Sequence, residues 1–429
     1  MQNQLLPFRQ PIKASVSLPG SKSLSNRALL IAACAKGTSV IENVPVNQDV
    51  SAAIDALKAL GISFAYDRQK AVIQIEGCQG QFPRRKARIF CNEAGTLTRF
   101  IIPLCAGQCE GEYLIDAAPR MRERPIQDQL EVLDALGMKA EYTSRFKHLP
   151  MTIYAVGLCS RQVQVRGEKS SQFLSGLLMA APLIENGLSI ESWVEHRQPY
   201  VDMTVKVMGD FGVCVRKNDR IYQVLGKQSY QACRYRIEPD VSTASYFWAL
   251  AAISGGEVKV CGISRASIQG DIRFLEVLEK MGCVVIEEQS SITVKRTGSL
   301  KGVTVNMRNF SDTFMTLAAI ASFADSDTRI TGLAHTKAQE SDRLRAMSDG
   351  LKRLGIAVTA DGDSIDICPQ QSCLKAGVVE SCNDHRIAMS LALLGLVQDG
   401  VWINGAECVS KTCPDYFERI NKIVQQSRL

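Results

Sequence analysis

The chain has few of the residues from which metal and disulfide sites are built. Only four histidines occur in 429 residues, and none of the 15 cysteines form a Cys-x-x-Cys pair. Zinc sites usually combine closely spaced cysteines and histidines, so the sequence gives no support for a metal. The N-terminus has no apolar core of signal-peptide length, and the cysteine count is odd. We therefore expect free thiols in a cytoplasmic protein.

Long apolar runs and a strong charge of one sign are also absent. No segment approaches 18 consecutive apolar residues, so no membrane span is expected. Lysine and arginine exceed aspartate and glutamate by only 50 − 44 = 6, whereas duplex nucleic acid usually requires a concentrated basic face. The composition is otherwise that of a globular protein, and the length suggests about two or three domains. These features favour small anionic ligands over membranes or nucleic acids.

What the chain does contain is an internal repeat. A helix-like segment that ends in a glycine recurs at Gly61, Gly137, Gly212, Gly282 and Gly355, at steps of 76, 75, 70 and 73 residues. A glycine directly after the last apolar helical position predicts a left-handed C-cap. The apolar residues that follow each glycine indicate a strand.

A second pattern alternates with the first. It has a polar start, an alanine-rich helix such as ALLIAACA or TLAAIASFA, and an alternating strand, and its six copies nearly fill the chain. Helices with so few charges are expected to be buried on all sides. We predict an α/β fold, a two-domain inside-out α/β barrel in which each domain has three repeated units with buried helices. The first domain would be discontinuous, residues 1–19 with 239–429, and the second would span 20–238.

The six starts of these helices carry polar and charged side chains. They are Lys22-Ser23 with Arg27, Gly95-Thr96 with Arg99, Ser170-Ser171-Gln172, Asp240 with Ser242-Thr243, Ser311-Asp312, and Asp384-His385-Arg386. Taken singly, each serine, threonine or aspartate is more often an N-cap than a ligand. Basic residues at a helix start, however, oppose the helix dipole. Their recurrence indicates a site for anions, which the N–H groups of helix N-termini also favour.

Seven motifs follow one another from about residue 10 to residue 420. They read LPGSKSLSNRALLIAA, AGTLTRF, PRMRERPI, SSQFLSGLLMAAPL, ESDRLRAM, NDHRIAM and SKTCPDYF. In sequence and order they resemble the motifs of the EPSP synthase family, the 3-phosphoshikimate 1-carboxyvinyltransferases. The resemblance implies two three-unit domains with an active site in the cleft between them. It implies transfer of the enolpyruvyl group of phosphoenolpyruvate to the 5-hydroxyl of shikimate 3-phosphate, through a tetrahedral intermediate, with release of phosphate. It also implies no cofactor, and we expect a monomer.

The resemblance assigns a role to each matching residue. Lys22, Asp312 and Glu340 would be catalytic, Asp312 as the base at the hydroxyl and Glu340 as the acid at the phosphoenolpyruvate methylene. Shikimate 3-phosphate would contact Lys22, Ser23, Arg27, Ser170, Ser171, Gln172, Arg197, Asp312 and Gln339. Phosphoenolpyruvate would contact Lys22, Gly95, Arg124, Gln172, Arg343, His385, Arg386 and Lys411. Planar guanidinium groups match carboxylate and phosphate well.

Three positions depart from the usual family pattern. Glu93 stands where asparagine is common, Arg197 where serine is common, and Gln339 where lysine is common. We expect Glu93 to point away from a phosphate or to pair with an arginine. Arg197 would be a stronger phosphate partner than serine, and Gln339 would keep hydrogen bonding without a charge.

Two alternative functions fit part of the pattern. The UDP-N-acetylglucosamine enolpyruvyl transferases share the fold, but they typically have Lys-Asn where this chain has Lys22-Ser23. They also typically have a cysteine in a mobile loop, whereas Cys105 and Cys109 fall in an apolar, helix-like run. The other alternative is a non-catalytic anion-binding paralogue. Such a protein would gain nothing from the two acids Asp312 and Glu340.

Overall fold

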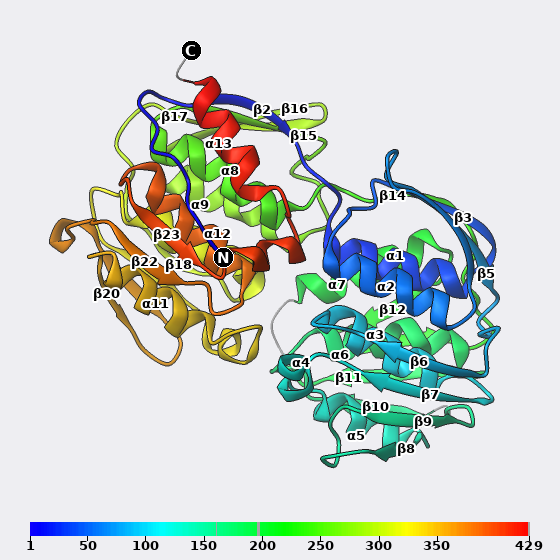
Figure 1. The fold of residues 1–429 in the computed structure, drawn as a ribbon. Helices are drawn as coiled ribbons and strands as arrows, with labels where there is room; N and C mark the ends of the chain where they lie inside the picture. Colours follow the sequence, from blue (N-terminus) through cyan, green and yellow to red (C-terminus); the bar gives the residue numbers. More distant parts are fainter. Residues whose placement is uncertain (160, 195–197, 428–429) are drawn as a thin grey trace. The chain divides into compact units, whose positions relative to one another are not determined.

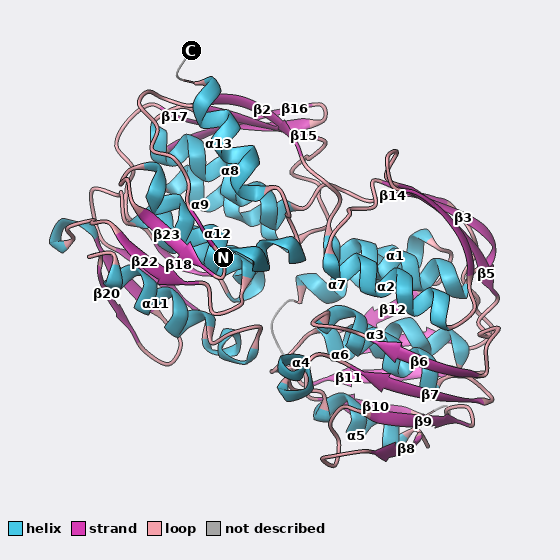
Figure 2. Ribbon diagram, viewed as in Figure 1, coloured by secondary structure: helices cyan, strands magenta, loops and turns pink. Residues whose placement is uncertain are grey.

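The computed structural model describes residues 1–159, 161–194 and 198–427. The chain divides into two compact units, Met1–Leu18 with Pro239–Leu429, and Pro19–Glu238. Both are mixed α/β, with helices packed against several small sheets (Figures 1 and 2). The α/β fold predicted from the repeat is confirmed, although the described strands form separate three- and four-stranded sheets and no closed barrel. No helix in the described part of the chain is long and apolar enough to cross a membrane.

The unit Pro19–Glu238 contains three copies of one arrangement. Its helices are α1 (Lys22–Cys34), α2 (Gln48–Ala59), α3 (Gly95–Ala106), α4 (Pro119–Glu123), α5 (Gln127–Ala135), α6 (Gln172–Ala180) and α7 (Pro199–Asp210). Its strands are β3 (Lys36–Glu42), β4 (Ser63–Asp67), β5 (Val72–Cys78), β6 (Lys86–Phe90), β7 (Gly111–Asp116), β8 (Lys139–Tyr142), β9 (Met151–Ala155), β10 (Gln162–Val165), β11 (Gly187–Ser192), β12 (Val215–Asn218), β13 (Ile221–Leu225) and β14 (Arg234–Arg236). The sheet orders are β14-β3-β5-β4, β6-β7-β9-β8 and β10-β11-β13-β12. In each sheet the first pair is parallel and the other two pairs are antiparallel.

The unit formed by Met1–Leu18 and Pro239–Leu429 repeats the same order of strands within its sheets. Its helices are α8 (Val241–Ser254), α9 (Phe274–Lys280), α10 (Phe314–Ala321), α11 (Arg343–Arg353), α12 (His385–Ala392) and α13 (Tyr416–Gln426). Its strands are β1 (Gln2–Asn3), β2 (Lys13–Ser17), β15 (Glu257–Cys261), β16 (Cys283–Glu288), β17 (Ser291–Arg296), β18 (Thr304–Asn306), β19 (Thr328–Thr331), β20 (Ala357–Ala360), β21 (Ile365–Cys368), β22 (Gly377–Glu380) and β23 (Val401–Asn404). They form the sheets β2-β15-β17-β16, β18-β19-β21-β20 and β22-β23-β1.

The N-terminal segment completes two sheets of the C-terminal half. Strand β2 pairs in parallel with β15, and the two-residue strand β1 pairs antiparallel with β23 (Figure 1). In the other unit, β14 comes from the end of the segment and pairs with β3 near its start. Each unit is therefore completed by a strand from the opposite end of its own sequence.

The predicted helix C-caps are confirmed. The glycines at 61, 137, 212, 282 and 355 have φ values of 81°, 95°, 83°, 92° and 82°. A residue with a Cβ is disfavoured in this left-handed region, whereas glycine adopts it readily. These glycines end the outer helices of successive repeats, so the spacing in the sequence corresponds to a repeated backbone turn.

The inner helices are buried on all sides, as their composition predicts. Every residue of α8 and of α10 is buried, and small side chains let such helices approach closely. In α6, a Cβ on Gly176 would lie 2.3 Å from the backbone oxygen of Arg99 in α3 and 2.7 Å from Nε2 of Gln129. The Gln129 amide itself donates to the carbonyls of Arg99 and Phe173, at 2.9 and 3.1 Å.

Replacing Gly176 with alanine is therefore expected to lower the free energy of unfolding by about 1–3 kcal/mol, the usual cost of overpacking a core. Urea denaturation would measure it. The matched control is Gly209→Ala, in α7, because no atom lies within 4 Å of the Cβ added there. That substitution should be neutral or stabilise by up to about 1 kcal/mol through helix propensity. Equal effects of the two substitutions would show that the α3–α6 contact does not limit packing.

Candidate active site

The helix starts of the unit Pro19–Glu238 lie where the sequence predicts them. Helices α1, α3 and α6 begin at Lys22, Gly95 and Gln172. The side chain of Ser21 caps α1 by accepting from the backbone N of Leu24. The N–H groups of these first turns and the cations beside them are the elements of an anion-binding site.

Lys22 is held by an acid that the sequence did not single out. Its Nζ lies 3.2 Å from Oδ2 of Asp49, and the two side chains are only 10% and 4% exposed. Asp49 lies in the first turn of α2, behind the N-cap Asn47. An acid in the first turn of a helix is common, because it is stabilised by the helix dipole. The sequence alone therefore did not connect Asp49 to Lys22.

Arg27 is buried and linked to a neighbouring helix. Its Nε donates to Thr204 Oγ1 at 2.7 Å, Nη2 to the Tyr200 carbonyl at 3.1 Å, and Nη1 to the Ser23 carbonyl at 3.0 Å. The guanidinium lies over the Phe100 ring, 4.9 Å from its centre. Burial lowers the pKa of Arg27 to about 9. Its predicted contact with a substrate carboxylate stays a prediction, and Arg27 also has the structural role of joining α1 to α7.

A second cationic group surrounds the start of α3. Arg99 donates through Nη1 to Gln172 Oε1 at 2.8 Å, and through Nε and Nη2 to the Pro125 carbonyl at 3.2 and 2.8 Å. Burial, and then the charge of Arg124, hold the pKa of Arg99 below its usual value. A Cβ on Gly95 would lie 2.6 Å from Nη1 of Arg124 and 2.8 Å from Nη1 of Arg99. Glycine thus lets two guanidinium groups reach one helix start.

The remaining predicted residues of this unit lie close to the starts of α3 and α6, or outside the residues that the structure describes. Ser170 and Ser171 directly precede α6, and Ser170 Oγ accepts from the backbone N of Gln172 at 3.2 Å. Arg197 lies outside the described residues. Glu93 is half-buried, two residues before α3. Cys105 is buried in α3, whereas Cys109 is exposed beyond the end of that helix.

In the other unit, the predicted base bridges two arginines. Asp312 lies in the 3-10 turn Arg308–Thr313 that leads into α10. Its Oδ1 is 3.0 Å from Nη1 of Arg343, the first residue of α11, and its Oδ2 is 2.9 Å from Nη2 of Arg386 in α12. Gln339 Oε1 accepts from Arg343 Nη1 at 2.6 Å. The uncharged Gln339 thus keeps a hydrogen bond, as the sequence predicts.

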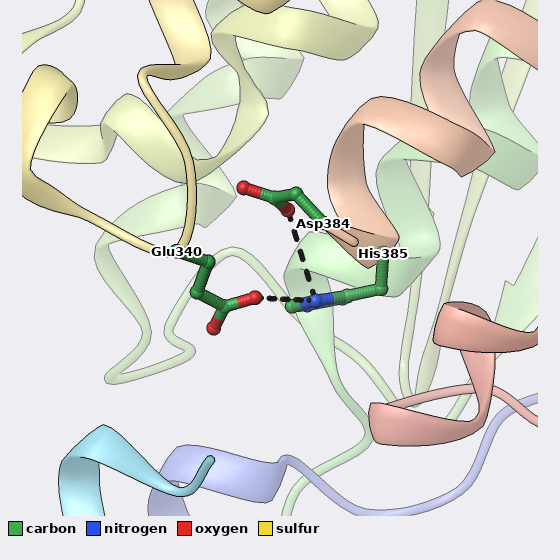
Figure 3. A group of neighbouring side chains, drawn as sticks. All are labelled: Glu340, Asp384 and His385. Carbon is green, nitrogen blue, oxygen red and sulfur yellow. Dashed lines mark ion pairs between the residues drawn. The ribbon is translucent and has the colours of Figure 1, made fainter. Parts of the chain in front are cut away.

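The predicted acid lies between a lysine and a histidine. Glu340 Oε1 is 3.1 Å from Nζ of Lys411, and Oε2 is 2.8 Å from Nδ1 of the fully buried His385. Figure 3 shows the carboxylates of Glu340 and Asp384 facing the same ring nitrogen of His385. Motifs far apart in the sequence, ESDR, NDHR and SKTC, therefore meet at one place.

Asp384 is a third carboxylate in this group. Its side chain is fully buried and accepts from Arg343 Nε at 2.8 Å, Ser341 Oγ at 3.0 Å and the backbone N of Arg386 at 3.0 Å. Burial, the largest single effect, raises the pKa of Asp384, but the effects that lower the pKa, led by the charge of Arg343, together outweigh burial, and the net pKa is lowered. The sequence marked Asp384 only as a helix start.

The same residues offer ligand atoms that a metal could use. Within the described residues, one oxygen each from Glu340 and Asp384 and a ring nitrogen of His385 lie within 4.8 Å of one another. Both carboxylates are, however, already paired with the cations Lys411 and Arg343. These ion pairs account for the cluster without a metal.

Asp271 is a further buried acid that the sequence did not indicate. It lies in the 3-10 turn Gly270–Arg273 and accepts a short hydrogen bond from Ser242 Oγ in α8. Burial, followed by the charge of Asp312, raises the pKa of Asp271 to about 7. Ser242 was marked as a helix start, but nothing in the sequence connected it with an acid about 30 residues later.

The raised pKa of Asp271 predicts a pH dependence of stability. Between about pH 4 and pH 7 the unfolded carboxyl is ionised while the folded one keeps its proton. The native state then binds more protons, so this group makes the free energy of unfolding fall as pH rises through that window. Urea titrations should show that the wild type loses more stability from pH 4.5 to pH 7 than Asp271→Asn. Parallel profiles would contradict the assignment.

The side chains described in the two units point to a class of protein. Cations at helix starts, arginine forks and two carboxylates in contact with them suit an enzyme that binds phosphate or carboxylate groups and moves protons on them. Comparison with known proteins also identifies an enzyme. A model of the EPSP synthase (3-phosphoshikimate 1-carboxyvinyltransferase) family matches residues 8–420, and the chain belongs to this family.

Individual relatives cover the chain almost completely. The chain is 40% identical over 423 residues to a 3-phosphoshikimate 1-carboxyvinyltransferase of Trichormus variabilis, with 98% of each chain covered. Among solved structures it is similar to an EPSP synthase from Acinetobacter baumannii, with a TM-score of 0.83, 26% identity and 98% of each chain covered. The enolpyruvyl transferase NikO from Streptomyces tendae shares the fold, with a TM-score of 0.74 at 16% identity over 98% of this chain and 97% of that one.

Proposed function

We propose that this enzyme transfers the enolpyruvyl group of phosphoenolpyruvate to the 5-hydroxyl of shikimate 3-phosphate and releases phosphate. The observation that carries the proposal is the pairing of Asp312 and Glu340 with the cations of the site. Asp312 contacts Arg343 and Arg386, and Glu340 contacts Lys411 and His385. Binding of anions alone requires the cations, but proton transfer also requires the carboxylates.

The roles of these groups follow from the chemistry. As the acceptor hydroxyl attacks C2 of phosphoenolpyruvate, Asp312 takes the hydroxyl proton and Glu340 gives a proton to C3. The resulting tetrahedral intermediate then returns a proton from C3 to the Glu340 carboxylate, which re-forms the double bond, while the C2–O bond to phosphate breaks and phosphate leaves with the electron pair. Lys22 stabilises the negative charge that develops on the oxygens. In the structure, before any substrate binds, Asp312 lies in contact with two arginines and Glu340 in contact with Lys411.

We assign the substrates to the residues named from the family motifs. Phosphoenolpyruvate contacts Arg343, Arg386, Lys411 and His385 in one unit, and Lys22, Gly95, Arg124 and Gln172 in the other. Shikimate 3-phosphate contacts Lys22, Ser23, Arg27, Ser170, Ser171, Gln172, Arg197, Asp312 and Gln339. The crowding of Arg99 and Arg124 at Gly95 supports an anionic ligand there. One chain carries all of these residues, so we propose a monomer. We also propose a cytoplasmic location, because the cysteines of the described residues are free thiols, as is usual in a reducing compartment.

A single assay tests the reaction. Purified enzyme is mixed with phosphoenolpyruvate and either shikimate 3-phosphate or UDP-N-acetylglucosamine, and phosphate release is measured together with the mass of the product. We expect release only with shikimate 3-phosphate, and a product heavier by one enolpyruvyl group. Release only with UDP-N-acetylglucosamine would assign the other transferase activity. If neither acceptor gave any release, the chain would be the non-catalytic paralogue.

A further inference from the structure

Arg343 is shared between two aspartates. Asp384 accepts from its Nε at 2.8 Å and from its Nη2 at 3.3 Å. Asp312 lies on the other terminal nitrogen, with Oδ1 3.0 Å from Nη1. A guanidinium has five N–H donors in one plane, so the two acids occupy different edges of the same group.

The two aspartates differ in how they are held. The Asp384 side chain is 0% exposed, and Ser341 and the backbone of α12 donate to it as well. The Asp312 side chain is 21% exposed, and it contacts the terminal nitrogens of Arg343 and Arg386. These two arginines are also the groups to which we assign phosphoenolpyruvate. An anion that binds them must therefore compete with the Asp312 carboxylate.

We infer that Asp384 is a positioning residue that fixes Arg343, and that Asp312 is an internal competitor for the anion-binding edge of Arg343 and Arg386. This inference rests on the proposed function of the site. When the substrate anion takes the arginine donors, Asp312 loses two positive neighbours and becomes a stronger base. When phosphate leaves, the carboxylate returns to the arginines. The strength of the base is thereby coupled to occupancy of the phosphoenolpyruvate site.

The two aspartates can be compared with substitutions of equal charge. Asp312→Asn and Asp384→Asn each remove one negative charge next to Arg343 and keep the side-chain size. Phosphoenolpyruvate binding without the acceptor is measured by titration calorimetry. We expect Asp312→Asn to lower the Kd by about tenfold, because a charge-assisted competitor is removed. We expect Asp384→Asn to raise it by about tenfold, because Arg343 loses its fixed partner.

Opposite shifts are the decisive result. A general electrostatic effect would make both variants bind the anion more tightly, and that outcome would overturn the inference, as would an unchanged or raised Kd for Asp312→Asn. If Asp384→Asn does not fold, as judged by its melting temperature, Ser341→Ala replaces it. That variant keeps all charges and removes one donor to Asp384, so we expect about threefold weaker binding. Unchanged binding would show that Asp384 does not position Arg343.

Failure of the inference is distinguishable from failure of the proposed function. The titration needs no turnover and is repeated with inorganic phosphate as the anion. If the variants shift in opposite directions but the wild type forms no product from shikimate 3-phosphate, the inference stands and the assigned reaction is wrong. If the wild type forms product but the variants shift together, the reaction stands and the competition between Asp312 and the substrate is refuted.

Discussion

Replacing Glu340 with glutamine is expected to lower kcat by a factor of about 10²–10⁴, the usual contribution of a general acid. Glutamine keeps the size of the side chain, and its single amide oxygen can still accept from Lys411, whose Nζ lies 3.1 Å from Oε1 of Glu340. It has no proton to give to C3 of phosphoenolpyruvate. The measurement is phosphate release with both substrates saturating, so that a change in binding does not enter.

The matched control for this substitution is Glu418→Gln, an identical change at an exposed position of α13. It should leave kcat unchanged. If Glu340→Gln kept more than about a tenth of the wild-type kcat, its effect would be too small for a general acid. Glu340 would then only hold Lys411 and His385 in place.

Replacing Lys22 with glutamine is expected to lower kcat/KM by a factor of about 10²–10³, the effect of removing one donor that stabilises developing negative charge. The substitution should also destabilise the fold. Asp49, 4% exposed, would lose the ammonium that lies 3.2 Å from it, and breaking a buried ion pair costs about 3–5 kcal/mol. Steady-state kinetics and urea denaturation of the same preparation would measure both effects.

A second substitution separates these two effects. In the double variant Lys22→Gln with Asp49→Asn, no buried charge is left without its ion pair, so most of the lost stability should return. Activity should stay low, because the proposed contact of Lys22 with the substrates is still missing. If the double variant regained activity along with stability, the ion pair with Asp49 would be a purely structural contact and Lys22 would have no catalytic role.

The fold could be predicted from the sequence because its determinants are local and repeated. Each of the five repeat glycines, at 61, 137, 212, 282 and 355, ends a helix by its own backbone geometry, whatever its tertiary surroundings. Alanine-rich segments such as α10 carry no charge, and this property alone requires burial on every side. The closing of a barrel depends on pairing between strands of different repeats. The sequence pattern carries no information on it, and the described sheets stay separate.

The site could be predicted only in part. The cations were found because arginine and lysine at helix starts oppose the helix dipole, a local feature. The contacts of three acids were missed, because Asp49, Asp271 and Asp384 at or near helix starts look like ordinary caps. Their partners are determined by tertiary packing. The same limit applies to Arg27, whose donors are used by Thr204 and by backbone carbonyls.

The strand pairing at the N-terminus determines the order in which the chain can fold during synthesis. Strand β1 (Gln2–Asn3) precedes its partner β23 (Val401–Asn404) by about 400 residues, so the two strands are synthesised at different times. At about 5–20 residues per second, about 20–80 s separate them. All strands of the unit Pro19–Glu238 are complete once β14 has been made, so this unit can fold while the ribosome is still reading the other. Strand β2 can pair once β15 (Glu257–Cys261) has been made, whereas β1 must wait with its backbone groups unpaired until the final repeat supplies β23.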